Sequence, residues 1–158
     1  MILYHGSDKA IPAPSLFFAR DTTDFGKGFY TTTISSQAKK WAERYKRRHG
    51  SGVVSVYEIN EDEFQKNISV LEFDTYSEEW LDYIIKCRKG EITSTFDLVI
   101  GGIANDDVFN TLTLFYRGFF DKSEAIKRLR YEKPNIQYCF KTQAVMEKHL
   151  VYKGSEVL

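Results

Sequence analysis

Three short segments of the sequence place polar and aromatic side chains at the ends of expected strands, and the first two also contain glycine. They are Tyr4–Ser7 (YHGS), Asp24–Thr33 (DFGKGFYTTT) and Ile136–Phe140 (IQYCF). Glycine lets a ligand approach the backbone closely, and His5 and Ser7 offer hydrogen-bond donors and acceptors to a polar ligand. Taken alone, the first segment is explained as well by an ordinary turn, and the third by a half-buried strand.

The central segment combines backbone freedom, one positive charge and an aromatic pair. Gly26 and Gly28 bracket Lys27, whose charge would suit a phosphate. Phe29 and Tyr30 alternate across the expected strand, so one faces the core and the other faces out. An outward tyrosine at a glycine-rich rim can stack on a flat heterocycle. A β-hairpin turn followed by a strand explains this segment equally well.

Composition limits the classes of protein to which the chain can belong. A length of 158 residues fits one domain, residues 1–158, and a net charge of zero gives no global field that selects nucleic acid or membrane. Two isolated cysteines and three scattered histidines do not support a metal site. We therefore expect no metal cofactor. Signal and membrane-spanning patterns are missing, so we also expect no membrane partner and a cytoplasmic location.

The expected elements alternate irregularly between strands and helices. Helices are expected at 37–49 and 77–89, the first capped by Ser35 or Ser36 and ended by Gly50. Strands are expected at 53–59, 96–100, 136–140 and 150–152. Regular βαβ units are not evident, so we predict an α+β domain with two packed layers.

The helix at 37–49 has two distinct faces. Ala38, Trp41, Ala42 and Tyr45 recur at helical spacing, which turns Trp41 inward, and most of the residues between Lys39 and Arg48 that lie outside this stripe are basic. Such a basic run is a solvated helix face or an anion-binding surface.

The order of these segments resembles the ADP-ribosyltransferase superfamily. The similarity is to its diphtheria-toxin and poly(ADP-ribose) polymerase side, which carries a His–Tyr–Glu triad. The resemblance rests on the segments His5–Ser7 and Phe25–Thr32, which are followed by the helix expected at 37–49. The chain is also similar, over nearly its whole length, to a family of short prokaryotic proteins long classified as a domain of unknown function. The segments shared with that family are Asp24–Tyr30, Val99–Gly101 with Ala104–Asp107, and Gln137–Phe140.

The resemblance implies a fold, a co-substrate and residue roles. The fold would be a split mixed β-sheet with flanking helices and an NAD cleft between the sheet halves. His5 would bond the nicotinamide-side ribose, Gly6 would hold the carboxamide, and Tyr30 would stack on the nicotinamide ring. Gln137 falls where the superfamily carries its catalytic glutamate. Further NAD contacts are expected from Ser7, Arg20 and Gly28.

The implied activity is NAD-dependent mono-ADP-ribosyl transfer to a protein or nucleic-acid acceptor. The resemblance further implies an intracellular toxin or effector paired with a neutralising antitoxin protein. Gln137 can accept a hydrogen bond but has no charge to stabilise a positive sugar, so another acid would have to supply it. Asp106 and Asp107 are candidates, and they equally suit a helix start. The alternative is an inactive domain of this fold that binds NAD or a partner protein.

Overall fold

The computed structural model describes residues 1–64, 66–91, 96–104, 106–129 and 135–158, and it is an α+β protein, as predicted. In chain order the elements are β1 (Ile2–Ser7), the 3-10 helix η1 (Leu16–Phe18), β2 (Phe29–Thr31), α1 (Ser35–His49), β3 (Val53–Glu58), α2 (Glu61–Phe64), β4 (Val70–Glu72), α3 (Glu78–Arg88), β5 (Leu98–Gly102), α4 (Asp106–Tyr116), α5 (Lys122–Leu129), β6 (Ile136–Phe140), α6 (Gln143–His149) and β7 (Val151–Val157). None of the helices in these ranges is long and apolar enough to span a membrane.

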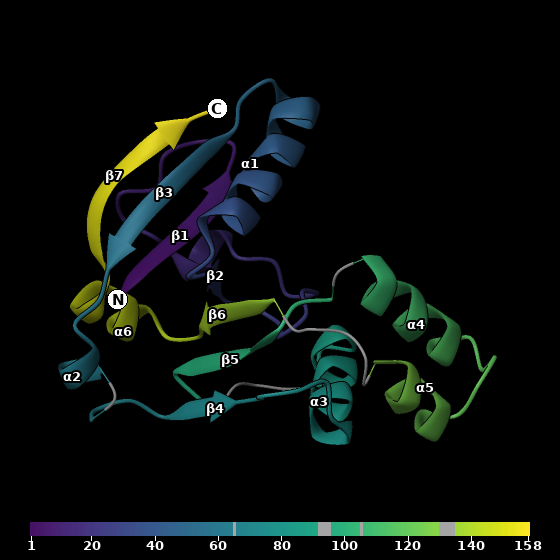
Figure 1. The fold of residues 1–158 in the computed structure, drawn as a ribbon. Helices are drawn as coiled ribbons and strands as arrows, with labels where there is room; N and C mark the ends of the chain where they lie inside the picture. Colours follow the sequence, from purple (N-terminus) through teal and green to yellow (C-terminus); the bar gives the residue numbers. More distant parts are fainter. Residues whose placement is uncertain (65, 92–95, 105, 130–134) are drawn as a thin grey trace.

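The strands form two sheets (Figure 1). The first sheet has the order β1-β3-β7 and is antiparallel throughout. The second has the order β2-β6-β5-β4, in which β4 and β5 run parallel and the other pairs antiparallel. The edge strands β1 and β2 meet at a single-residue bridge between Tyr4 and Thr32, so the two sheets are joined there.

Helix α1 covers the first sheet through its small residues. Ala38 and Ala42 are fully buried and pack with Val54 of β3. A Cβ at Gly6 of β1 would lie 2.1 Å from the carbonyl oxygen of Ala38, so this position needs glycine for α1 to lie so close. Trp41 does not enter this core, contrary to expectation; it is half-buried beside it.

The two ends of α1 differ in how well the sequence predicted them. Gly50 ends the helix in a left-handed conformation, as expected, and its N–H donates to the Lys46 carbonyl. At the start, Ile34 occupies the cap position without a side-chain bond, and the predicted cap serines lie inside the helix. The hydroxyl of Thr32 accepts the Ile34 N–H instead. The bridge residue Thr32 therefore also sets where α1 begins.

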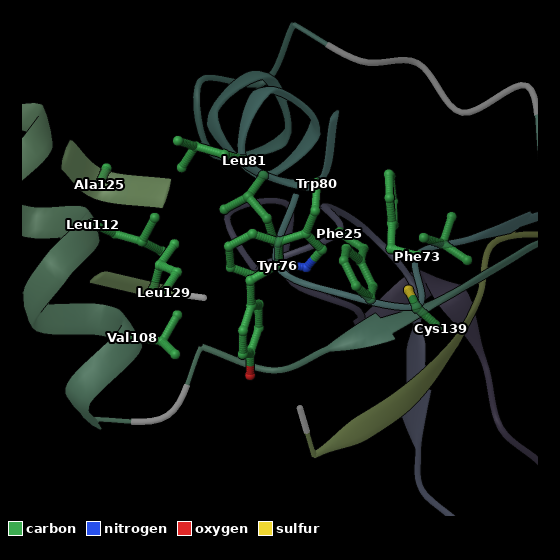
Figure 2. Close-up of a cluster of buried hydrophobic side chains, with 12 residues drawn as sticks. Phe25, Phe73, Tyr76, Trp80, Leu81, Val108, Leu112, Ala125, Leu129 and Cys139 are labelled. Atoms are coloured by element: carbon green, nitrogen blue, oxygen red, sulfur yellow. The ribbon is translucent and has the colours of Figure 1, made fainter. Parts of the chain in front are cut away.

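The second sheet has its own hydrophobic core, against which α3, α4 and α5 pack (Figure 2). Trp80, Leu81 and Ile84 of α3 are fully buried, and Ser77 caps that helix by accepting the Trp80 N–H at 3.2 Å. The indole N–H of Trp80 donates to the carbonyl of Gly102, which ties α3 to the end of β5. This end of β5 leads directly to the part of the chain that faces the first sheet.

The last strand is longer than the sequence indicates. The apolar pattern predicts a strand at 150–152, whereas β7 runs from Val151 to Val157 and pairs with β3 on both sides of a register shift at Lys153. Most of its residues are exposed, because β7 is an edge strand of the first sheet. Exposed edge strands lack the burial that makes periodicity visible, which explains the difference.

The close approach of Gly28 to β6 gives the first prediction. A Cβ at Gly28 would lie 2.3 Å from Sγ of Cys139 and 2.9 Å from the Phe140 carbonyl oxygen. We expect Gly28→Ala to lower the free energy of unfolding by about 1–3 kcal/mol, measured by urea denaturation. The loss should be smaller when Cys139→Ala is already present, because the sulfur is then gone. Equal losses in both backgrounds would contradict this account.

Candidate functional site

A large cleft opens where the two sheets meet, with a volume of about 1330 Å³. Its walls come from β1, the loop that follows it, β2, one face of α1 and the ends of β5 and β6. Seven of the residues predicted for the site line it: His5, Gly6, Ser7, Arg20, Gly28, Tyr30 and Gln137. The fold thus brings together segments that lie more than 100 residues apart.

The His5 ring is held between the two sheets. Its Nδ1 lies 2.6 Å from the carbonyl oxygen of Tyr30, and the ring stacks on Phe29 with centroids 4.4 Å apart. A carbonyl only accepts, so Nδ1 carries the proton in this bond. Burial lowers the pKa of His5 and outweighs the opposing effect of the bond to Tyr30. The ring is therefore neutral at pH 7, and Nε2 is left as a hydrogen-bond acceptor.

Gly6 presents a free strand edge to the cleft. The N–H and C=O of Tyr4 bond to Thr32 of the second sheet, so they point away from β3. Peptide groups alternate in direction along an antiparallel strand, and Gly6, two residues on, therefore points its own N–H and C=O the same way. Because β2 has already diverged here, these groups face the cleft that Gly6 lines. An amide ligand could bond to both.

The hydroxyl of Tyr30 is fully used within the protein. It accepts the Phe25 N–H at 2.9 Å, lies 2.7 Å from the Gly26 carbonyl oxygen to which it donates, and lies 2.7 Å from the Thr23 hydroxyl. Burial raises the pKa of Tyr30 well above its ordinary value. The hydroxyl is therefore unsuited to proton transfer, and what Tyr30 offers a ligand is its ring.

Gln137 lies on β6 and is 2% exposed, not solvent-facing as its strand position alone suggests. In the register of the sheet Tyr30 pairs with Cys139, so Tyr30, Cys139 and Gln137 share one face. Its Nε2 is buried and has no hydrogen-bond partner among the described residues. An unpaired buried donor costs about 1–3 kcal/mol, which marks Gln137 as a group that awaits a ligand.

The other three residues predicted to contact NAD differ in burial and in their bonds within the protein. Ser7 is buried and donates its hydroxyl proton to the Lys9 carbonyl at 2.6 Å. Arg20 is exposed on the loop after η1. Gly28 is pressed against β6, so packing already requires glycine there. All three line the cleft, and their contacts to NAD stay predictions.

Of the two acids proposed to support Gln137, only the side chain of Asp107 can be placed. Asp107 is exposed on α4 and does not line the cleft, so it fits the ordinary helix start. The side chain of Asp106 lies outside the described residues. The carboxylates that do line the cleft are Asp8, directly after β1, and Asp24.

Asp24 has a positioning role that the sequence did not reveal. One carboxylate oxygen lies 2.6 Å from Arg88 of α3, and the other accepts the Ala104 N–H at 3.0 Å. Lys141 also donates to the Phe25 carbonyl. Together with the bonds of the Tyr30 hydroxyl, these bonds hold the glycine segment, Asp24–Tyr30, in place. The ion pair depends on long-range packing of α3, so no local sequence signal predicts it.

Gln37 is a further residue that sequence reasoning missed. It is 7% exposed, lines the cleft, and neither its Nε2 nor its Oε1 has a partner among the described residues. Gln37 lies one helical turn before Trp41, so the helical period places the two on one side of α1, but nothing in the sequence shows that this side borders a cleft. Trp41, one turn on, also lines the cleft. The site thus includes one face of α1 as well as the strand ends.

Thiol and metal chemistry have little support in this part of the molecule. Cys87 and Cys139 are free and buried, and burial raises the pKa of Cys139 to about 12, which disfavours a reactive thiolate. In the described ranges, no three His, Cys, Asp or Glu side chains are grouped to hold a metal ion.

The Tyr30 hydroxyl can be tested apart from the ring. Tyr30→Phe leaves the buried Phe25 N–H without its acceptor, so we expect unfolding free energy to fall by about 1–3 kcal/mol. Tyr116→Phe removes a hydroxyl from an exposed side chain and should change it by less than about 0.5 kcal/mol. Urea denaturation of both variants checks this. Equal stability of Tyr30→Phe and the wild type would show that the hydroxyl does not hold the segment.

The neutral state of His5 predicts a pH dependence. Because its folded pKa lies below the ordinary 6.5, the folded state resists protonation, and stability is lost as pH falls from about 6.5 through that pKa. His5→Asn should therefore lose less stability than the wild type between pH 7.5 and pH 5.5. Urea denaturation at several pH values measures this, and a ring titrating at or above 6.5 by NMR would contradict it.

Comparison with known proteins gives a family but no activity. No curated protein and no solved structure matches the chain. A family model does match, over residues 1–152, and its description is "Protein of unknown function (DUF3990)". This match includes every residue of the cleft named above, so the chain belongs to the DUF3990 family of proteins of unknown function.

Proposed function

We propose that the protein is an NAD-dependent mono-ADP-ribosyltransferase with an ADP-ribosyltransferase-like fold. The observation that carries the proposal is the meeting of His5, Gly6, Tyr30 and Gln137 in one cleft between two sheets. These are the residues to which the sequence resemblance assigns roles toward NAD. Two divergent sheets joined at Tyr4 and Thr32 also support a split sheet with its cleft between the halves.

The cleft has groups that fit the nicotinamide end of NAD. The exposed edge of Gly6 offers an N–H and a C=O, which is the pair that a carboxamide needs. The ring of Tyr30 lines the cleft, and Phe25 stacks on it with centroids 6.5 Å apart. Nε2 of neutral His5 can accept a hydrogen bond from a ribose hydroxyl. Nε2 of Gln137 adds a buried donor that has no partner among the described residues.

The reaction consists of one bond broken and one formed. The bond between nicotinamide nitrogen and ribose C1′ breaks, and its electron pair stays on that nitrogen and neutralises the pyridinium ring. The ribose becomes oxocarbenium-like, as in glycoside cleavage. A nucleophilic oxygen or nitrogen of the acceptor forms the new bond to C1′ and loses its proton to solvent. Gly6, His5 and Tyr30 fix the two halves of the breaking bond, which favours reaction by orientation.

Gln137 limits how strongly the protein can stabilise the positive sugar. Its carbonyl oxygen can accept a hydrogen bond from the ribose 2′-hydroxyl, but it adds a dipole and no charge. Asp8 lines the cleft next to the His5–Ser7 strand, and Asp24 is committed to Arg88. We therefore assign Asp8 as the carboxylate available to supply negative charge. The same lack of charge at Gln137 favours the second candidate, an inactive domain that binds NAD or a partner protein.

The biological role that we propose is that of an intracellular toxin or effector. Its support is the resemblance to small stand-alone ADP-ribosyltransferases, which commonly occur with a neutralising antitoxin. The acceptor would be a cellular protein or nucleic acid, and the location cytoplasmic. Co-expression with a small neighbouring gene that suppresses toxicity would supply the antitoxin partner.

Labelled NAD tests the activity and Gln137 together. Incubation with cell lysate should transfer label and release nicotinamide, and Gln137→Ala should lower both strongly. Gln137→Glu should keep or raise NAD hydrolysis, because the positive nicotinamide ring of bound NAD favours the ionised carboxylate, which then adds the missing charge. Burial will raise the pKa of this new carboxyl, so Gln137→Glu should lose stability relative to wild type as pH rises above about 4.3.

Controls separate loss of activity from loss of fold. Asn110→Ala removes an exposed amide on α4 and should leave transfer and melting temperature unchanged. NAD binding without transfer or nicotinamide release would favour the inactive domain. Unchanged rates in both Gln137 variants would remove this residue from the site.

A further inference from the structure

The cleft is larger than one small ligand needs. Its volume of about 1330 Å³ exceeds the roughly 1,000 Å³ at the upper end of small-molecule sites. The excess lies along α1, because the lining continues from Gln37 near the helix start to Arg48 near its end. At about 1.5 Å rise per residue these two positions are some 16 Å apart along the axis. The site therefore continues outward as a groove beside α1.

This α1 groove carries a concentrated positive charge in a protein of zero net charge. Lys40, Arg44 and Arg48 are spaced four residues apart, so they form one stripe along the helix, about 6 Å from one cation to the next. All three are exposed and line the cleft. Among the described residues, five cations line it, including Lys9 and Arg20, and two carboxylates, those of Asp8 and Asp24. The basic run between Lys39 and Arg48, for which the sequence allows either a solvated face or an anion-binding surface, thus borders the site.

Aromatic rings from two elements line the cleft together with these cations. On α1, Trp41 and Tyr45 are half-buried and line it. From η1, Phe18 lines it with 83% of its surface exposed, in edge-to-face contact with the equally exposed Phe17. The backbone of η1 is anchored, since the Leu16 N–H donates to Gln143 of α6. Rings exposed from an anchored segment are unusual unless they bind something.

From these observations we infer that the acceptor of the transferase is a single-stranded nucleic acid, bound along the α1 groove with its backbone on the cationic stripe and its bases on the rings. Cations in a groove combined with aromatic platforms are how proteins hold single strands. An acidic polypeptide would use the charge but leave the rings without partners. The transfer step rests on the proposed function, whereas strand binding does not.

Binding can be measured without NAD. A labelled single-stranded RNA or DNA of about 12 nucleotides should bind, and a duplex of equal length should bind more weakly because its bases are not free to stack. Fluorescence should report the site, because Trp41 is in the groove while Trp80, the other tryptophan, is fully buried. We expect the strand to quench Trp41. Comparing RNA with DNA shows whether the 2′-hydroxyl matters.

Charge variants on the same helix supply the decisive comparison. Lys40→Ala/Arg48→Ala removes two groove cations, and Lys46→Ala/Arg47→Ala removes two exposed cations that do not line the cleft. The first variant should weaken binding on the order of tenfold and reduce the slope of log affinity against log salt by about 1.4, or 0.7 for each phosphate contact. The second should behave as wild type. Tyr45→Ala should weaken binding roughly fivefold to a hundredfold, as for the loss of one stacked base.

Several results would overturn the inference. No strand binding, equal effects of the two charge variants, equal affinity for duplex, or competition by poly-glutamate as effective as that by the strand would each do so. Nicotinamide release measured without nucleic acid tests the proposed function separately. A protein that binds strands but never cleaves NAD would leave the groove in place and remove the transferase.

Discussion

The two sheets share a buried cluster that includes Leu3 and Tyr57 of the first sheet and Phe29, Leu98 and Phe140 of the second, and one backbone bridge sets where the sheets diverge. Tyr4 and Thr32 exchange hydrogen bonds of 2.8 and 3.0 Å, and they join the edge strand of one sheet to the edge strand of the other. Because the pairing stops after this bridge, β1 and β2 diverge and a cleft opens beside Gly6. The His5–Tyr30 bond lies on the opened side and fixes the width of its start. Longer pairing would have made one continuous sheet with its edge groups satisfied and no room for a ligand.

The glycine segment is rigid, which changes how its composition should be understood. Both glycines are required by the backbone, because Gly26 has a positive φ of 70° and Gly28 lies too close to β6 for a side chain. Asp24 and the Tyr30 hydroxyl then tie the segment to α3 and to its own backbone. A ligand that meets the Tyr30 ring therefore meets a surface already ordered, so little entropy is lost on binding.

How much was predictable varies with whether the determining contacts are local. The bounds of β6 and the Gly50 end of α1 match expectation, because period-two burial and a left-handed glycine are local signals. The start of α1 does not, since a threonine from the bridge replaces the expected serine cap. The cleft position of Trp41 and the unpaired amide of Gln37 depend on where the second sheet lies relative to α1, which a helical period does not encode. The same applies to Asp107, which belongs to a shared sequence segment but does not line the cleft in the folded chain.

Burial explains why a glutamine at the end of β6 is compatible with a working site. Gln137 is 2% exposed, and a glutamate there in the free protein would be a buried carboxylate that burial drives toward its protonated form. Glutamine avoids that cost and keeps an acceptor for a ribose hydroxyl, while its unpaired nitrogen retains a demand for a second partner. In the proposed reaction the negative charge would have to come from another residue that lines the cleft. Asp8 is partly exposed, directly follows β1 and lines the cleft. The proposal therefore divides the two tasks of the superfamily's glutamate, with hydrogen bonding at Gln137 and negative charge at Asp8.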